Sequence, residues 1–396
     1  MGGPLDGVRV LDLSQIVSGP YSAMMLSDLG AEVIKVEAIE STDPLRTGLF
    51  QRGGLAALYL NNNRGKRVIS VDIRTEAGRD IVLDLVQRTD VVVQNMRPGV
   101  LDRLGLGYAD CTKRNEQIIY CSISGYGTDG PWAQRPVLDP VIQGVVGIVA
   151  RQKSEAIPIP DLVRMVIADK WAAQMATQAV LAALFCRERT GQGQHIDLSM
   201  LDTALYLSWP DLMMDYTHLG EGVSPGLRVV DIYQLTDCLD AKLIYFCANN
   251  NQLRGVLRAL GRGELCEDPR FSTSAATAKP ENFEALGAII VDEFSKVRRD
   301  EVLARLVEND VPCGPILEPD EVPFNEQIVH NKSLVEWEHP EAGVLRQPRS
   351  PIHFSGTPTE FKTGCAQVGQ HTDEVLLELG RTTADIAALR SAGQIA

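Results

Sequence analysis

The sequence lacks several features by which common classes of protein are recognised. Its eight cysteines are scattered without a C-x-x-C pair and its six histidines are not clustered, so neither a disulfide framework nor a bound metal is expected. No apolar run reaches the roughly 18–20 residues that a membrane span needs. The first residues show no basic region followed by an apolar stretch, so we expect a cytoplasmic protein with no membrane partner.

Positive charge is also scarce. The 396 residues include 38 Lys and Arg against 52 Asp and Glu, which gives a formal net charge of −14. This balance opposes the broad basic surface that nucleic-acid backbones require, so no nucleic-acid partner is expected. A small phosphorylated ligand stays compatible with it, because a few local arginines suffice to bind one.

A glycine fingerprint is missing where a dinucleotide-binding protein would carry one. The turn after the first predicted strand, Ser14–Pro20, reads S-Q-I-V-S-G-P in place of G-x-G-x-x-G. A nicotinamide-dependent dehydrogenase is therefore a poor interpretation.

The first half of the chain alternates short β-branched runs with amphipathic segments. This pattern predicts an α/β fold with a Rossmann-like, doubly wound parallel sheet. The predicted strands are residues 8–13, 32–37, 67–73, 90–94, 117–124 and 195–199. The predicted helices are residues 21–30, 76–88, 169–187 and 200–216.

The length of the chain exceeds one ordinary domain of roughly 100–200 residues. Residues 220–226 (GEGVSPG) read as a linker, and a strand at 243–248 with helices at 252–260 and 280–309 predicts a smaller α/β domain. After a proline-rich run that predicts loops, an acidic helix at 372–380 lacks a core of its own. A tail without its own core is compatible with a return of the chain to the first domain.

Eight passages in the order of the chain together resemble the family III CoA-transferases of the CaiB/BaiF type, to which formyl-CoA transferase belongs. They are residues 5–13 with 18–20, 30–37, 63–67, 95–105, 122–127, 190–194, 311–315 and 369–375. The resemblance implies an enzyme that moves coenzyme A from an acyl-CoA to a free carboxylic acid. It further implies that CoA is a substrate, that no cofactor is tightly bound, and that two interlocked subunits form a homodimer. It also implies a large domain built from both chain ends, residues 1–224 with 331–396, and a small domain of residues 225–330 between them.

The resemblance places the catalytic nucleophile at Asp169, which begins the long helix before the T-G-Q-G-Q passage. An aspartate with an ordinary pKa of about 3.9 is ionised at neutral pH and can attack a thioester carbonyl without a partner base. The implied intermediate is an aspartyl-CoA thioester. The structural alternative is an aspartate that only caps its helix.

The family pattern also indicates where CoA is held, at turns that follow the predicted strands. The residues at these places are Gln15, Ile16, Val17, Ser18, Val71, Asp72, Ile73, Arg74, Asn95, Met96, Arg97 and Arg103. Arginines and backbone N–H groups at strand ends suit the diphosphate of CoA, although each arginine is equally compatible with a solvated surface charge. Some relatives have glutamine where Val17 stands and arginine where Ala38 stands, which puts their acyl specificity in doubt here.

Four further points stay open. A 2-methylacyl-CoA racemase of the same fold needs a histidine and an aspartate, and relatives of that kind carry His-Asp where this chain has Leu138-Asp139. Asp139 either assists the transferase or caps the helix that starts near Pro140. A non-catalytic acyl-CoA-binding protein would keep the fold without turnover. Asn249–Asn251 replace a glycine-bearing flap, and they serve either as such a flap or as a plain polar turn.

Overall fold

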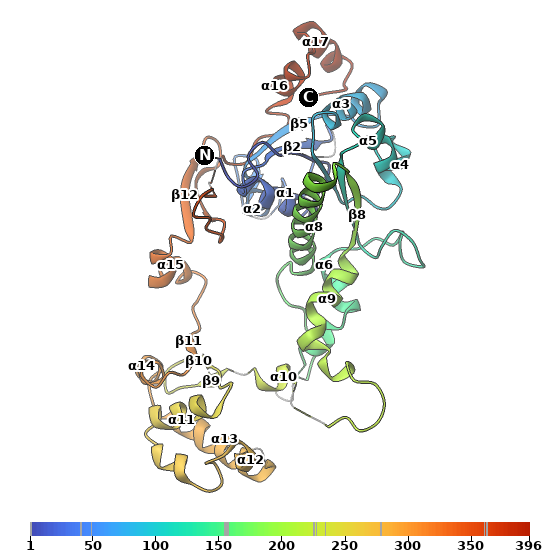
Figure 1. The fold of residues 1–396 in the computed structure, drawn as a ribbon. Coiled ribbons are helices and arrows are strands. Elements are labelled where there is room, and N and C mark those ends of the chain that lie inside the picture. The colour runs from blue at the N-terminus through green and yellow to red at the C-terminus, as the bar shows by residue number, and fades with distance from the viewer. Residues whose placement is uncertain are drawn as a thin grey trace. The chain divides into compact units, whose positions relative to one another are not determined.

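The computed structural model describes residues 2–39, 42–48, 50–153, 158–224, 226, 228–233, 235–277, 279–359, 361 and 363–396. The chain divides into two compact units, Met1–Thr217 with Lys332–Ala396 and His218–Asn331 (Figure 1). Within the described part of the chain, no helix combines the length and the apolar character that crossing a membrane would require.

The first unit is built on a parallel six-stranded sheet with the order β5-β2-β1-β6-β7-β8. Its strands are β1 (Arg9–Asp12), β2 (Glu32–Glu37), β5 (Lys66–Ser70), β6 (Val91–Gln94), β7 (Ile119–Ser124) and β8 (Gln194–Ser199). The order reverses between β1 and β6, which is the switch point where doubly wound sheets bind ligands beyond their strand ends. The predicted doubly wound α/β fold is confirmed.

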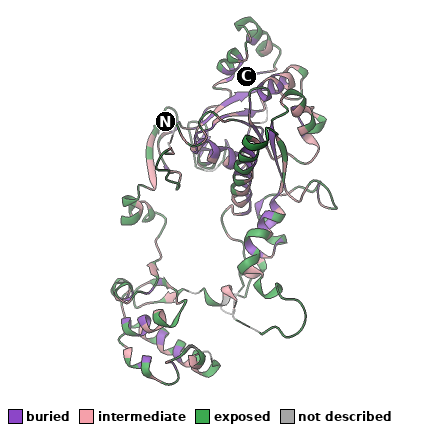
Figure 2. Ribbon diagram, in the orientation of Figure 1, coloured by how far each residue is buried: buried purple, intermediate pink, exposed green. Residues whose placement is uncertain are grey.

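Helices cover both faces of this sheet. One face carries α1 (Ser18–Asp28), α8 (Ala168–Thr190) and α9 (Met200–Leu212), and the other carries α3 (Glu76–Val86), α4 (Val100–Arg103) and α5 (Tyr108–Arg114). Because both faces are covered, the central strands are buried throughout, and Val91, Val92 and Val93 are 0% exposed (Figure 2). α8 ends at Thr190, and the next residue, Gly191, has the φ of 72° of the left-handed cap that the glycine predicts.

The C-terminal segment returns to β5. Helix α16 (Thr372–Glu378) starts beside this strand, where the Ser70 N–H donates to the Thr372 Oγ1 at 3.1 Å. The Ala396 N–H donates to the Ser70 carbonyl at 3.2 Å, and α17 (Thr383–Ser391) lies between these two contacts. The proline-rich run predicted as loops instead contains the hairpin β12 (Leu334–His339) and β13 (Gly343–Pro348).

Short elements complete the first unit. They are β3 (Gln51–Arg52), β4 (Leu55–Ala56), α2 (Ala57–Asn63), α6 (Asp139–Val145), α7 (Ile148–Arg151) and the 3-10 helix η1 (Met214–Tyr216).

The second unit has a small antiparallel sheet of order β11-β10-β9 packed with helices. Its elements are α10 (Val229–Ile232), β9 (Thr236–Asp237), β10 (Lys242–Tyr245), α11 (Asn250–Ala259), η2 (Gly263–Glu267), α12 (Ser274–Thr277), α13 (Pro280–Ser295), α14 (Arg299–Glu308), β11 (Cys313–Pro315), η3 (Val322–Phe324) and α15 (Glu326–His330). The Phe294 ring is fully buried and stacks on Tyr245, with ring centroids 5.0 Å apart.

Replacing Phe294 by alanine is expected to destabilise the second unit by about 3–5 kcal/mol, because it removes a buried ring and leaves a cavity. Urea unfolding followed by circular dichroism measures the loss. Phe283→Ala is the control on the same helix, since its ring is 55% exposed and its removal should change the midpoint little. Equal losses for the two variants would contradict the packing described here.

Candidate active site

The turns that follow β1 and β6 meet at the switch point of the sheet. Asn95 joins them: its Oδ1 accepts a hydrogen bond from the Gln15 N–H at 2.8 Å, and its Nδ2 donates to the Gln15 carbonyl at 2.7 Å. The same Nδ2 donates to the Ser18 Oγ at 3.1 Å. Gln15 and Ser18, two of the residues predicted from the family pattern to hold CoA, are thus hydrogen-bonded to a third, Asn95.

The other predicted CoA residues differ in what they can offer a ligand. Arg97 follows Met96 in the β6 turn and is exposed, and Arg103 is the exposed last residue of α4. Val17 is 2% exposed, so the backbone is the part of it best placed for a ligand.

The segment Val71–Arg74 follows β5, which is separated from β1 by β2. Val71 is fully buried and forms an isolated bridge to Ile395. Arg74 hydrogen-bonds to Asp72, with Nε 2.8 Å from the Oδ1, and this contact lowers the Asp72 pKa below its usual value. This segment therefore lies apart from the switch point, at the β5 edge, where it packs against the end of the chain.

Asp169 is the second residue of α8 and is 7% exposed. It does not cap this helix, because the cap position is Ile167. A different carboxylate serves the helix start: Asp139 Oδ2 accepts from the Ala168 N–H at 2.6 Å and from the Asp169 N–H at 3.2 Å. Of the two roles left open for Asp139, the structure does not show a cap on its own helix, since α6 begins at Asp139 and has Leu138 at its cap position.

The surroundings of the Asp169 carboxylate act on its charge in opposite directions. Burial, and then the like charge of Asp139, raise the pKa of Asp169 to about 6. Hydrogen bonds from the side chain and the backbone N–H of Ser18 lower it again. Ser18 is the first residue of α1, so the carboxylate also faces the positive end of that helix. α1 and α8 are held together nearby by a 3.0 Å contact between the hydroxyls of Ser22 and Thr177.

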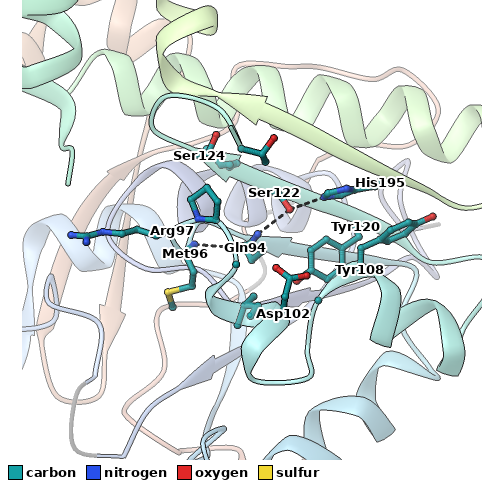
Figure 3. Close-up of a pocket in the computed structure, with 15 residues that line it drawn as sticks. Gln94, Met96, Arg97, Asp102, Tyr108, Tyr120, Ser122, Ser124 and His195 are labelled. Atoms are coloured by element: carbon teal, nitrogen blue, oxygen red, sulfur yellow. Dashed lines mark hydrogen bonds between the residues drawn. The ribbon is translucent and has the colours of Figure 1, made fainter. Parts of the chain in front are cut away.

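A cavity of about 210 Å³ opens beyond the ends of β6 and β7 (Figure 3). A polar chain lines it: Gln94 Nε2 donates to the Ser122 Oγ at 2.9 Å, and this hydroxyl lies 2.9 Å from His195 Nε2. The His195 ring stacks on Tyr108 with centroids 5.0 Å apart. Of the predicted CoA residues, Met96 and Arg97 line the cavity, whereas Asp169 does not.

The sequence interpretation missed the polar residues of this cavity and the link between Asp139 and α8. A signal for the first was present, because Ser122 opens the S-I-S-G-Y-G passage and His195 lies in the strand that follows T-G-Q-G-Q. No pattern connects Asp139 with a helix that starts 29 residues later.

Asn249–Asn251 begin a helix in the second unit. Asn249 has an extended backbone, with φ −154°, and its side chain caps α11 by accepting from the Gln252 N–H at 3.0 Å. These residues therefore form a polar helix start without a left-handed turn. Among the described residues, no group of three or more His, Cys, Asp or Glu side chains is arranged to hold a metal ion.

The family model described as CoA-transferase family III matches residues 5–372, and the chain belongs to this family. It is similar to the succinyl-CoA:glutarate CoA-transferase of Homo sapiens, with 33% identity over 99% of this chain and 90% of that protein. It is 32% identical to the succinate–glutarate CoA-transferase of Agrobacterium fabrum, covering 95% of this chain and 96% of that one.

Two further similarities extend this result. The formyl-CoA:oxalate CoA-transferase of Streptomyces coelicolor is 30% identical over 99% of both chains. The crystal structure of a CaiB/BaiF family protein from Brucella suis superposes with a TM-score of 0.82 at 34% identity, covering 96% of this chain and 100% of that one. The chain is thus an enzyme of the CoA-transferase class.

Asp139→Asn is expected to lower the pKa of Asp169, because it removes the like charge while the amide oxygen can still accept from the start of α8. Carbon-13 NMR of protein labelled at the aspartate carboxyls measures this pKa, with the Asp169 signal assigned by its loss in Asp169→Asn. The new amide would face the Gln143 Nε2, which now donates to Asp139, so a stability loss of about 1 kcal/mol should accompany the change. Exposed Asp129→Asn serves as the control, and an unchanged or raised Asp169 pKa in Asp139→Asn would contradict the assignment.

Proposed function

We propose that the protein transfers CoA from an acyl-CoA to a free carboxylic acid through a thioester on Asp169. The observation that carries this proposal is the environment of the carboxylate, which is 7% exposed and has a pKa of about 6. At pH 7 such a group is still ionised by about tenfold over its protonated form, so it is ready to attack. Its burial also limits access of water, which would hydrolyse an activated acyl intermediate.

The proposed reaction consists of four displacements at carbonyl carbons. The Asp169 carboxylate attacks the donor thioester and releases CoA thiolate, which leaves a mixed anhydride. The thiolate attacks the Asp169 carbonyl of this anhydride and releases the donor acid, which leaves the aspartyl-CoA thioester. The acceptor carboxylate then forms a second anhydride and frees the thiolate again. Attack of the thiolate on the acceptor carbonyl yields the new acyl-CoA and restores Asp169.

CoA binding is proposed at the switch point. The turns joined by Asn95 present backbone groups there, and Arg97 and Arg103 follow β6 as exposed guanidinium groups that suit the phosphates of CoA. The segment Val71–Arg74 is proposed as a more distant part of the same site, reached beyond β5.

Small dicarboxylic acids are the proposed acceptors. The similar proteins from Homo sapiens and Agrobacterium fabrum are named for glutarate, and that from Streptomyces coelicolor for oxalate. An interlocked homodimer is proposed as the assembly, and a cytoplasmic location stays a prediction from the sequence.

The racemase interpretation receives less support from the geometry. Leu138 stands where racemase relatives have histidine, and the Asp139 oxygens accept hydrogen bonds from the start of α8 and from Gln143. A carboxylate engaged by three donors is poorly placed to exchange protons with a substrate.

Incubation with the matching acyl-CoA donor is expected to increase the intact mass of the protein by one CoA less one water, because the thioester joins CoA to Asp169. Asp169→Asn should abolish the adduct, since an amide cannot attack the thioester, and hydroxylamine should cleave it from the wild type. Adduct formation should slow as the pH falls through about 6, where Asp169 takes up a proton.

The donor panel would include succinyl-CoA, formyl-CoA and acetyl-CoA. Adduct formation that survives in Asp169→Asn would refute the proposed nucleophile. CoA binding without an adduct from any donor would favour the non-catalytic acyl-CoA-binding protein, and deuterium exchange at an acyl α-carbon would favour the racemase.

Arg97→Ala is expected to raise the KM for acyl-CoA by roughly 10- to 100-fold with little change in kcat, because it removes one charge-assisted hydrogen bond of about 1.5–3 kcal/mol to a part of the substrate that does not react. Initial rates over a range of donor concentrations measure the effect. Arg114→Ala, an exposed arginine at the end of α5, is the matched control. Equal KM values for Arg97→Ala and the wild type would remove Arg97 from the proposed CoA site.

A further inference from the structure

Four charged side chains lie in the interior beside the β1–α1 turn. Lys66 Nζ is 2.8 Å from the Asp12 Oδ2, and Lys35 Nζ is 3.1 Å from the Asp43 Oδ2, with all four side chains 0% exposed. Each buried ion costs several kcal/mol of desolvation, which its pairing offsets only when the remaining hydrogen bonds are also satisfied. We call these residues, Asp12, Lys35, Asp43 and Lys66, the buried charge cluster.

The remaining hydrogen bonds of the two lysines go to the backbone at both ends of the turn. Lys35 Nζ donates to the Ser14 carbonyl at 2.8 Å, and Lys66 Nζ donates to the Pro20 carbonyl at 2.8 Å. Lys66 also donates to the Asn63 Oδ1 at 2.8 Å. With Asp12 this makes three acceptors for the three N–H bonds of an ammonium group.

The two aspartates hold the N–H groups of the same turn. Asp12 Oδ1 accepts from the Ser14 N–H at 2.9 Å, and Asp43 Oδ2 lies 3.3 Å from the Ile16 N. Ile16 has a φ of 70°, a left-handed conformation that is strongly disfavoured for a β-branched side chain. Such a backbone is strained and persists only where its surroundings impose it.

The turn leads directly to Ser18, whose side chain and backbone N–H lower the pKa of the Asp169 carboxylate. We propose that Lys66, together with Asp12 and Asp43, is a positioning residue that holds the β1–α1 turn where Ser18 reaches Asp169. This inference rests on the proposed role of Asp169, because it explains how that carboxylate keeps its hydrogen-bond donors. Lys66 touches no reacting atom and acts through the turn.

Protonation of Lys66 is part of this arrangement. Burial lowers the pKa of Lys66 to about 8, although Asp12 raises it and the neighbouring Lys35 lowers it further. At neutral pH the side chain is therefore an ammonium group, as its three acceptors require.

The test is a double-mutant cycle read out on the Asp169 pKa by carbon-13 carboxyl NMR. Ser18→Ala is expected to raise this pKa, because it removes a hydrogen bond to the charged form. Lys66→Met should raise it as well by releasing the turn. If Lys66 acts through Ser18, the double variant should shift the pKa no more than the larger single change. A direct effect of the lost positive charge would instead add to that of Ser18→Ala.

Asp43→Asn gives a second test that keeps side-chain shape and does not depend on Lys66→Met folding. Removing a negative charge would by itself lower the Asp169 pKa, whereas loosening the Ile16 N–H contact should raise it. The two explanations thus predict opposite signs. Arg67→Met is the matched control, since Arg67 is next to Lys66 on β5 but pairs with Glu374 and Glu378.

The positioning role is overturned if folded Lys66→Met leaves the Asp169 pKa unchanged, if its effect adds to that of Ser18→Ala, or if Asp43→Asn lowers the pKa. A rise in Arg67→Met as large as that in Lys66→Met would also overturn it, because it would indicate general destabilisation. The NMR measurement needs no turnover. Failure to form a CoA adduct would therefore refute the proposed function alone, and the pKa results would refute the positioning role alone.

Discussion

The site depends on how two carboxylates are accommodated in one buried region. Asp139 and Asp169 are 4% and 7% exposed, and the charge of the first raises the pKa of the second. Asp139 is stabilised by two backbone N–H groups at the start of α8 and by Gln143. Asp169 is left with the donors of Ser18 at the start of α1. The Asp139 carboxylate is thereby occupied by hydrogen bonds within the protein, and Asp169 is the carboxylate that we propose reacts with the acyl-CoA.

This division makes the position of the β1–α1 turn important. The turn carries no glycine before Gly19, and Ile16 takes a left-handed backbone where a dinucleotide-binding turn would use glycine. A glycine would adopt this backbone conformation without strain. Here the hydrogen bonds of buried ion pairs at both ends of the turn hold the strained residue in place instead. The turn therefore lacks the G-x-G-x-x-G glycines because buried charged side chains, and not glycine flexibility, hold its conformation.

Much of the fold could be predicted from the sequence because the parallel strands are buried on both faces and read as β-branched runs. β2 was predicted at its observed bounds, and α8 within three residues at its C-terminal end. The hairpin β12–β13 could not be recognised in this way, because its prolines read as loop residues although Pro348 only ends a strand. The helix α17 was also missed, although Thr382 and Asp385 form a capping box at its start.

Some features of the candidate site could likewise be predicted from local sequence pattern, whereas others depend on tertiary contacts. Local pattern placed Asp169 at a helix start and Asn95 after a strand, and both positions agree with the structure. Local pattern cannot predict the pKa of Asp169, because the groups that set it come from α1 and α6 as well as α8. An aspartate read from sequence has its ordinary pKa, whereas here burial moves the carboxyl about two units closer to neutrality. The environment of Asp169, on which its proposed role as nucleophile rests, is therefore formed by the starts of three helices, α1, α6 and α8.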